Sequence, residues 1–196
     1  MKIAAIICEY NPFHHGHAAL FQALRERLGE DTAILCILGG NFAQRGVPAL
    51  FSKQARAEMA IRAGADLVLE LPFPHCAASA ERFASGGVHI AKALGCVDIL
   101  AFGSECADTE KLAALAKMLE SEAFTSAFSE EPKDTPIGTA AKTESVFRRV
   151  FGDCEALMLL REPNNLLGVE YIRALIRCGA DILPLALPRI GAAHGD

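Results

Sequence analysis

Short apolar runs that alternate with helical patterns constrain the fold more than any other feature of this sequence. The runs are largely hydrophobic along their whole length, and they cover residues 2–8, 33–38, 66–71, 97–102 and 181–187. Strands of this kind are typical of a parallel sheet that is buried on both faces. We therefore predict an α/β fold, a Rossmann-like open parallel sheet with helices on both faces.

The segments between these runs carry apolar residues at helical spacing. The first helix is expected after His17, ending at Gly29 in a left-handed conformation. Further helices are expected from Ser52 to Gly64, from Ser79 to Leu94 with Gly95 closing the helix, and over residues 109–128. Residues 129–138 form the only linker-like break, and the chain beyond them is mainly helical up to the last apolar run.

The composition is that of a folded protein. With 52% hydrophobic and 22% charged residues, the 196-residue chain can bury a core, so one domain over residues 1–196 is expected. Seven cysteines without a CxxC pair predict reduced thiols, with Cys8 and Cys36 buried. The first apolar run is too short for a membrane span and lacks a cleavage site, which by elimination predicts a cytoplasmic protein without membrane contact.

The net charge argues against a general nucleic-acid surface. At pH 7 the chain carries a formal charge of −5. Polyanion binding usually leaves a basic domain or stripe, so any RNA contact has to be local or lie elsewhere.

The strongest chemical signal is the segment Glu9-Tyr10-Asn11-Pro12-Phe13-His14-His15-Gly16-His17, between the first strand and the first helix. Ligands of open α/β sheets bind beyond the carboxyl ends of strands, where a helix N-terminus favours phosphate. Gly16 permits close approach of the backbone. We predict that His14 and His17 donate hydrogen bonds to phosphoryl oxygens as negative charge develops.

Other interpretations of these histidines are surface or capping roles, which would be preferred for a lone histidine. Two histidines that bracket a glycine at a strand-to-helix turn reverse that preference. A metal site is not favoured, because no cysteine or carboxylate pair at metal spacing accompanies them. His15 is expected to point elsewhere.

A second motif, residues 39–46, ends the second strand with two glycines and leads to Arg45 and Lys53. These cations could bind a phosphate, a carboxylate or a nucleic-acid backbone. We predict that they face the acyl or tRNA side of the site. The alternative is an ordinary loop, with Lys53 and Arg56 on the exposed face of the next helix.

Two later segments add polar groups at the same sheet edge. Gly103 ends the fourth strand and would allow a purine or ribose to lie against the backbone. Asn164 or Asn165 is expected to cap the helix that follows, a role compatible with ligand binding. Arg189 follows the last strand and therefore points to this edge.

Taken in order, these motifs resemble those of the tRNA(Met) cytidine acetate ligases, within the HxGH nucleotidyltransferase superfamily. The resemblance runs from residues 9–17 and 40–49 through Ser52-Lys53 and Phe102-Gly103-Ser104-Glu105 to residues 163–168. It implies a sheet of the HxGH nucleotidyltransferase type and an enzyme that activates acetate with ATP, accompanied by Mg²⁺. The resulting acetyl-adenylate would acetylate the wobble cytidine of elongator tRNA(Met).

The resemblance also implies site residues. His14, His17, Arg45 and Lys53 would act in catalysis. The nucleotide would contact Ile7, Cys8, Glu9, Tyr10, Asn11, Pro12, Phe13, His14, His15, Gly16, His17, Ala18, Ala19, Leu20, Gly103, Asn164 and Arg189.

Family members are longer and carry a further phosphate motif, so we expect the domain to be incomplete at its C-terminus. Two alternatives stay open. One is a small-molecule adenylyltransferase of the same class, and the other is a nucleotide-binding module that is catalytically incomplete.

Overall fold

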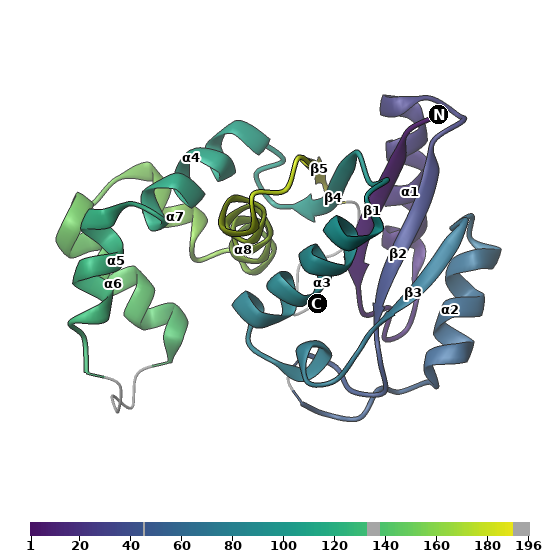
Figure 1. The fold of residues 1–196 in the computed structure, drawn as a ribbon, viewed down its shortest axis with the longest axis horizontal. Helices are drawn as coiled ribbons and strands as arrows, with labels where there is room; N and C mark the ends of the chain where they lie inside the picture. The colour runs from purple at the N-terminus through teal and green to yellow at the C-terminus, as the bar shows by residue number, and fades with distance from the viewer. Residues whose placement is uncertain (45, 133–137, 190–196) are drawn as a thin grey trace.

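A five-stranded parallel sheet forms the centre of the computed structural model, which describes residues 1–44, 46–132 and 138–189 (Figure 1). The strand order is β3-β2-β1-β4-β5, and every pair is parallel. The predicted open parallel sheet is thus confirmed. Its strands are β1 (Ile3–Cys8), β2 (Ala33–Gly39), β3 (Leu67–Leu71), β4 (Ile99–Ser104) and β5 (Leu183–Pro188).

Helices cover both faces of the sheet, also as predicted. On one face lie α1 (His15–Leu28) and α2 (Lys53–Arg62), and on the other lie α3 (Ala80–Leu94) and α8 (Pro163–Cys178) (Figure 1). Successive residues of a strand point to opposite faces. In β1, Ala4 and Ile6 therefore join the apolar core with α1, while Ala5 and Ile7 join the core with α3 and α8.

A group of shorter helices lies beyond α8, away from the sheet (Figure 1). It comprises α4 (Thr109–Leu119), α5 (Glu122–Ser129), α6 (Thr139–Phe151) and α7 (Glu155–Leu159), and a single 3₁₀ turn, η1 (His75–Ala77), precedes α3. Buried side chains of α4, α5 and α6 continue the same apolar core that α3 and α8 form against the sheet. Within the described residues, no helix is long and apolar enough to cross a membrane.

The helix predicted over residues 109–128 is in fact two helices, α4 and α5. Part of the reason is local, because the Ser121 hydroxyl caps α5 by accepting a hydrogen bond from the backbone N–H of Phe124 at 3.3 Å. Glu120, the residue before it, ends α4 and turns its carboxylate to arginines of α8. Of the predicted linker at 129–138, residues 133–137 lie outside the described part of the chain.

The observed ends of the helices confirm some of the predicted ends and correct others. Gly95 ends α3 in the left-handed conformation, with φ 67° and ψ 7°, as glycine permits. Gly29 also has positive φ, but its ψ of 148° is extended, so the left-handed helical conformation predicted for it is wrong. The first helix begins at His15, earlier than predicted, because His14 caps it. Cys8 and Cys36 are buried, as expected.

We predict that Gly168→Ala destabilises the protein. A Cβ at Gly168 would lie 2.4 Å from Cε2 of the Phe102 ring, so α8 and β4 would have to move apart. Overpacking of this kind costs about 1–3 kcal/mol, partly offset by the better helix propensity of alanine, about 1 kcal/mol. Urea unfolding should therefore show a net loss of up to about 2 kcal/mol.

Gly138→Ala is a control outside the core, because a Cβ at Gly138 meets no atom of the described residues within 4 Å. Gly138 is the N-cap of α6, where alanine is the poorer residue, so a small loss is expected from the cap alone. An equal loss in both variants would mean that the close packing of Gly168 against Phe102 is unimportant.

Candidate functional site

A cavity of about 430 Å³ opens at the carboxyl edge of the sheet, between β1 and β4. The two strands pair only through Ala4–Ile99 and Ala5–Leu100 and are unpaired with each other beyond these residues. The ends of both strands line the cavity. The strand order also changes direction here, because β2 and β3 lie on one side of β1 while β4 and β5 lie on the other. Such a point is the usual ligand site of an open α/β sheet.

His14 and His17 cap the beginning of α1 reciprocally. Nδ1 of His14 accepts a hydrogen bond from the backbone N–H of Gly16 at 3.1 Å, and Nδ1 of His17 accepts one from the N–H of His14 at 3.2 Å. Because Nδ1 is the acceptor in each ring, the proton of a neutral imidazole lies on Nε2, which is then a donor. The capping role is therefore real, and it occupies Nδ1 of each ring, so that Nε2 of His17 can donate to a ligand at the cavity.

His17 is held in its neutral form. The pKa of His17 is lowered from 6.5 to about 3, mainly by burial and to a smaller extent by the neighbouring charges of His14 and Arg189. Tyr10 contributes to this burial, since its ring centroid lies 4.7 Å from that of His17. The Tyr10 backbone is left-handed, with φ 47°, which is uncommon for a bulky residue. His17 is thus a neutral hydrogen-bond donor at physiological pH.

The opposite wall contains Gly103 and Arg189. A Cβ at Gly103 would lie 3.1 Å from Cγ of Arg189, closer than most side-chain contacts. The absence of a side chain at Gly103 therefore lets the arginine lie across the end of β4. Arg189 provides a permanent positive charge at this wall of the cavity.

The Glu105 carboxylate contacts the residues that form this wall. Its Oε1 accepts a hydrogen bond from Nδ2 of Asn164 at 2.6 Å, and its Oε2 accepts one from the N–H of Asn165 at 2.7 Å. Nη1 of Arg189 lies 3.8 Å from Oε1. Burial alone would raise the pKa of Glu105, but the hydrogen bonds from Asn164 and Asn165 outweigh burial and lower it.

This arrangement corrects the predicted cap of α8. Neither Asn164 nor Asn165 is the N-cap; that position is Glu162, and Pro163 is the first helical residue. The first N–H groups of the helix bind the Glu105 carboxylate instead. The Asn165 amide oxygen accepts from the Ser104 hydroxyl at 2.7 Å and so anchors the helix to β4.

Most of the predicted nucleotide residues surround the cavity, although they come from four separate segments. Phe13, His15, Ala18 and Ala19 are not part of its lining. Those that do line it are Ile7, Cys8, Glu9, Tyr10, Asn11, Pro12, His14, Gly16, His17, Leu20, Gly103, Asn164 and Arg189.

The two cations predicted with the second motif are not found in the cavity lining among the described residues. Arg45 falls outside the described residues. Lys53, the first residue of α2, forms an ion pair with Glu70 at 2.6 Å and does not line the cavity. The exposed position considered for Arg56 is wrong, because this residue is only 1% exposed. Its guanidinium binds backbone carbonyls of Glu9, Gly40 and Phe51.

Several cavity residues escaped the sequence analysis. Gln44 lies in the second motif, but its backbone N–H reaches back to the Glu9 carboxylate, a tertiary contact that no local pattern indicates. The others are apolar or aromatic residues of ordinary core positions, and only the closeness of their elements in the fold reveals them: Ile6, Phe83, Phe102, Leu167, Tyr171 and Pro188.

Among the described residues, no group of three or more His, Cys, Asp or Glu side chains is arranged to hold a metal ion. We therefore assign no protein ligand to the Mg²⁺ that the resemblance implies.

The parallel sheet, its crossover cavity and the His-x-Gly-His cap define an α/β domain of the nucleotidyltransferase type. Comparison with protein families agrees with this class. The chain belongs to the HIGH Nucleotidyl Transferase family, whose model matches residues 1–196.

Individual relatives are more specific. The chain is 42% identical to the tRNA(Met) cytidine acetate ligase of Acetivibrio thermocellus, over 97% of this chain and 46% of that protein. It is 42% identical to the enzyme of the same name from Syntrophotalea carbinolica, over 100% of this chain and 46% of that protein. The chain therefore spans about half the length of these curated relatives.

A solved structure is similarly close. The crystal structure of Thermotoga maritima TmcAL bound with alpha-thio ATP superimposes with a TM-score of 0.90 and 36% sequence identity. The match covers 97% of this chain and 47% of that one.

We predict that the His17 ring shows no titration step between pH 8 and about 5, as measured by histidine ring NMR. In urea the same ring should titrate near its ordinary pKa of 6.5. The unfolded chain then binds more protons than the folded chain below pH 6.5, so this histidine lowers stability as the pH falls from 6.5 toward 3. A normal titration of His17 in the folded chain would contradict its burial.

A second prediction concerns Glu105→Gln. Glutamine replaces one of the two carboxylate oxygens by an NH₂ group, which donates and cannot accept, so either the backbone N–H of Asn164 or that of Asn165 loses its acceptor. Protection of at least one of these two backbone amides from hydrogen exchange should fall by about tenfold or more. Because the pKa of Glu105 is lowered, the wild-type bonds are present at neutral pH and are lost only in acid.

The exposed Glu110 in α4 supplies the control, and Glu110→Gln should leave both amides protected. Unchanged exchange in Glu105→Gln would show that the carboxylate does not hold the start of α8.

Proposed function

We propose that the cavity binds ATP and that the protein is a tRNA(Met) cytidine acetate ligase. A carboxylate oxygen of acetate would attack the α-phosphorus of ATP, which forms acetyl-adenylate and releases pyrophosphate. The N4 amine of the wobble cytidine of elongator tRNA(Met) would then attack the acetyl carbonyl, and AMP would leave. The observation that carries this proposal is the Nε2 donor of His17 at the N-terminus of α1, beside the cavity, in a turn that His14 caps.

The phosphate side of the proposed site depends on α1. A helix N-terminus favours negative charge, and α1 carries no acidic residue in its first turn that would compete. A neutral His17 can donate to phosphate at neutral pH without first losing or gaining a proton. Donors fixed before the reaction stabilise charge that develops at the α-phosphate, because they need little reorganisation.

The nucleoside would lie against the opposite wall. Gly103 and Arg189 bound this wall, and the apolar side chains of Phe83 and Leu167 supply surface for a ring or ribose. Asn164 and Arg189 offer polar contacts, and Glu105 keeps both at this wall. This assignment agrees with the close structural similarity to TmcAL bound with alpha-thio ATP.

Arg45 and Lys53 are proposed to serve the acetate or tRNA side. Lys53 would have to exchange its partner Glu70 for a substrate group, which costs little because exposed ion pairs are weak. The net charge of −5 gives no general attraction for tRNA, so local cations would carry that contact. A tRNA substrate places the reaction in the cytoplasm.

Magnesium is proposed only as a companion of the nucleotide. It prefers phosphate oxygens and water to an all-protein cage, and it would neutralise charge on the triphosphate.

His17→Ala tests the ATP site directly. Loss of one hydrogen bond to a charged phosphate costs about 1.5–3 kcal/mol, so calorimetric titration should show ATP binding weakened by about 10- to 100-fold. His15→Ala is the matched control, because His15 is exposed and does not line the cavity. Equal affinities in wild type, His15→Ala and His17→Ala would remove the basis of the proposal.

The reaction is tested by incubating the protein with ATP, labelled acetate and tRNA(Met). Acetylcytidine together with AMP and pyrophosphate supports the ligase. Nucleotide transfer to a small phosphorylated acceptor without acetylcytidine would identify an adenylyltransferase, and ATP binding without pyrophosphate release would identify a binding module. Either of these results overturns the ligase assignment.

A further inference from the structure

A second cavity, of about 350 Å³, lies on the other side of α8 from the first. It is enclosed by the beginning of α3 and by α5, α6 and α8. Side chains of Phe124, Phe128 and Leu166 form an apolar wall, and hydroxyls of Thr125 and Thr143 lie among them. None of these residues lines the cavity proposed for ATP.

One carboxylate at this cavity is incompletely bonded. Glu170 is only 7% exposed and belongs to the lining. Its Oε1 accepts a hydrogen bond from Nη1 of Arg173 at 2.7 Å. Its Oε2 is buried and has no hydrogen-bond partner within the described part of the chain. A buried carboxylate oxygen without a donor is costly, so a donor supplied by a ligand would relieve a deficit already present in the protein.

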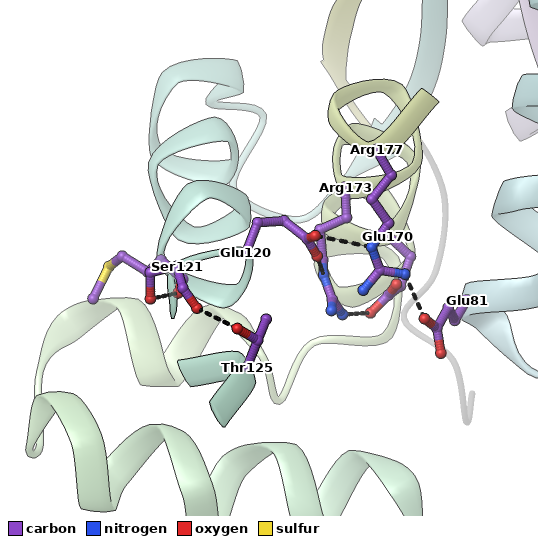
Figure 2. Close-up of polar contacts among 8 residues, drawn as sticks. Glu81, Glu120, Ser121, Thr125, Glu170, Arg173 and Arg177 are labelled. Carbon is purple, nitrogen blue, oxygen red and sulfur yellow. Dashed lines mark hydrogen bonds and ion pairs between the residues drawn. The ribbon is translucent and has the colours of Figure 1, made fainter. Parts of the chain in front are cut away.

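The charges around Glu170 do not balance (Figure 2). Nε of Arg173 and Nε of Arg177 donate to the two oxygens of Glu120 at 2.6 and 2.9 Å, and Nη1 of Arg177 pairs with Glu81. The three carboxylates of Glu81, Glu120 and Glu170 therefore face the two guanidiniums of Arg173 and Arg177. With all five groups ionised, the network carries one excess negative charge. Burial raises the pKa of Glu170 in spite of the neighbouring Arg173, so its negative charge is costly here and a cation beside Oε2 would stabilise it.

This excess selects among ligand classes. An anion would add to the charge and would offer no donor to Oε2 of Glu170, so phosphates and carboxylates fit poorly. A monocation with N–H groups balances the network and satisfies that oxygen. The apolar wall of Phe124, Phe128 and Leu166 suits the hydrocarbon part of such a cation.

We propose that the second cavity binds a small organic ammonium ion, which donates to Oε2 of Glu170 and rests its hydrocarbon part on Phe124, Phe128 and Leu166. The inference is independent of the proposed function, because the two cavities share no residue. It also accounts for the position of Glu170, whose Oε2 has no hydrogen-bond partner among the described residues.

The test uses three probes of similar shape, n-butylammonium, n-butanol and butyrate, with NMR of the labelled chain. Butylammonium at millimolar concentration should shift the signals of Thr125, Thr143 and Phe128 but not those of His17. Butanol should bind at least about tenfold more weakly, and butyrate should not bind. Equal responses to butylammonium and butanol, a preference for butyrate, or no response would overturn the proposal.

Two variants make the result specific. Glu170→Gln keeps the side-chain shape but removes the charge, and it should weaken butylammonium binding by about tenfold or more. Ala140→Phe fills the cavity from the exposed face of α6 without touching the arginine network, and it should also abolish binding. The adjacent Ala141→Phe is the control, because Ala141 is exposed and does not line the cavity. Wild-type affinity in Ala140→Phe would place the ligand elsewhere.

Discussion

The buried guanidinium of Arg56 holds together the loops on which the site depends. Helix α2 brings this side chain under the carboxyl edge of the sheet, where it donates to carbonyls of Glu9 and Gly40 at the ends of β1 and β2. Backbone carbonyls that leave a sheet at its edge lose their ladder partners, and arginine has enough donors to bind several of them at once. The turn that carries His14 and His17 begins next to this anchor. Its geometry is therefore set from α2 as well as from α1.

The separation of β1 from β4 has a second structural support. Ile7 lies beyond the last residue of β1 that pairs with β4, and its carbonyl accepts a hydrogen bond from the Tyr171 hydroxyl at 3.4 Å. Tyr171 thus lets the strands part without leaving this polar group unbonded. Its ring also packs near Phe102, with centroids 5.6 Å apart, which fills the space between α8 and β4. A crevice can exist between central strands because side chains take over bonds that a ladder would make.

Local patterns were sufficient for the architecture and for the first site motif. Each predicted apolar run overlaps a strand, and the runs are most continuous in the central strands β1, β2 and β4, which are buried on both faces. The turn at His14 was found because its residues are contiguous. The role of Glu105 was missed, since its partners Asn164 and Asn165 lie some 60 positions away in the sequence. The burial of Arg56 was missed for a related reason. A charged residue on a helix is usually exposed, unless hydrogen bonds to distant carbonyls offset the free-energy cost of its desolvation.

The break between α4 and α5 at Glu120 was also missed, because one of its causes is a contact between residues far apart in the sequence. A continuous apolar pattern suggested one helix over residues 109–128, and no local feature stronger than Ser121 indicated the break. The break is stabilised from α8, whose Arg173 and Arg177 both bind the Glu120 carboxylate. The spacing of apolar residues indicates which face of a helix is buried. The end of α4 depends in addition on the arginines of α8, which this spacing does not reveal.

The walls of the cavity between β1 and β4 come from segments near residues 6–20, 44, 83, 102–103, 164–171 and 188–189. No part of the unfolded chain holds more than one or two of these together, so the folded state alone can bind a ligand there. By mass action, a ligand at 100 times its dissociation constant adds about 2.7 kcal/mol to the free energy of unfolding. Occupancy of this cavity is therefore coupled to the stability of the whole sheet, and the melting temperature of the protein reports whether the cavity holds a ligand.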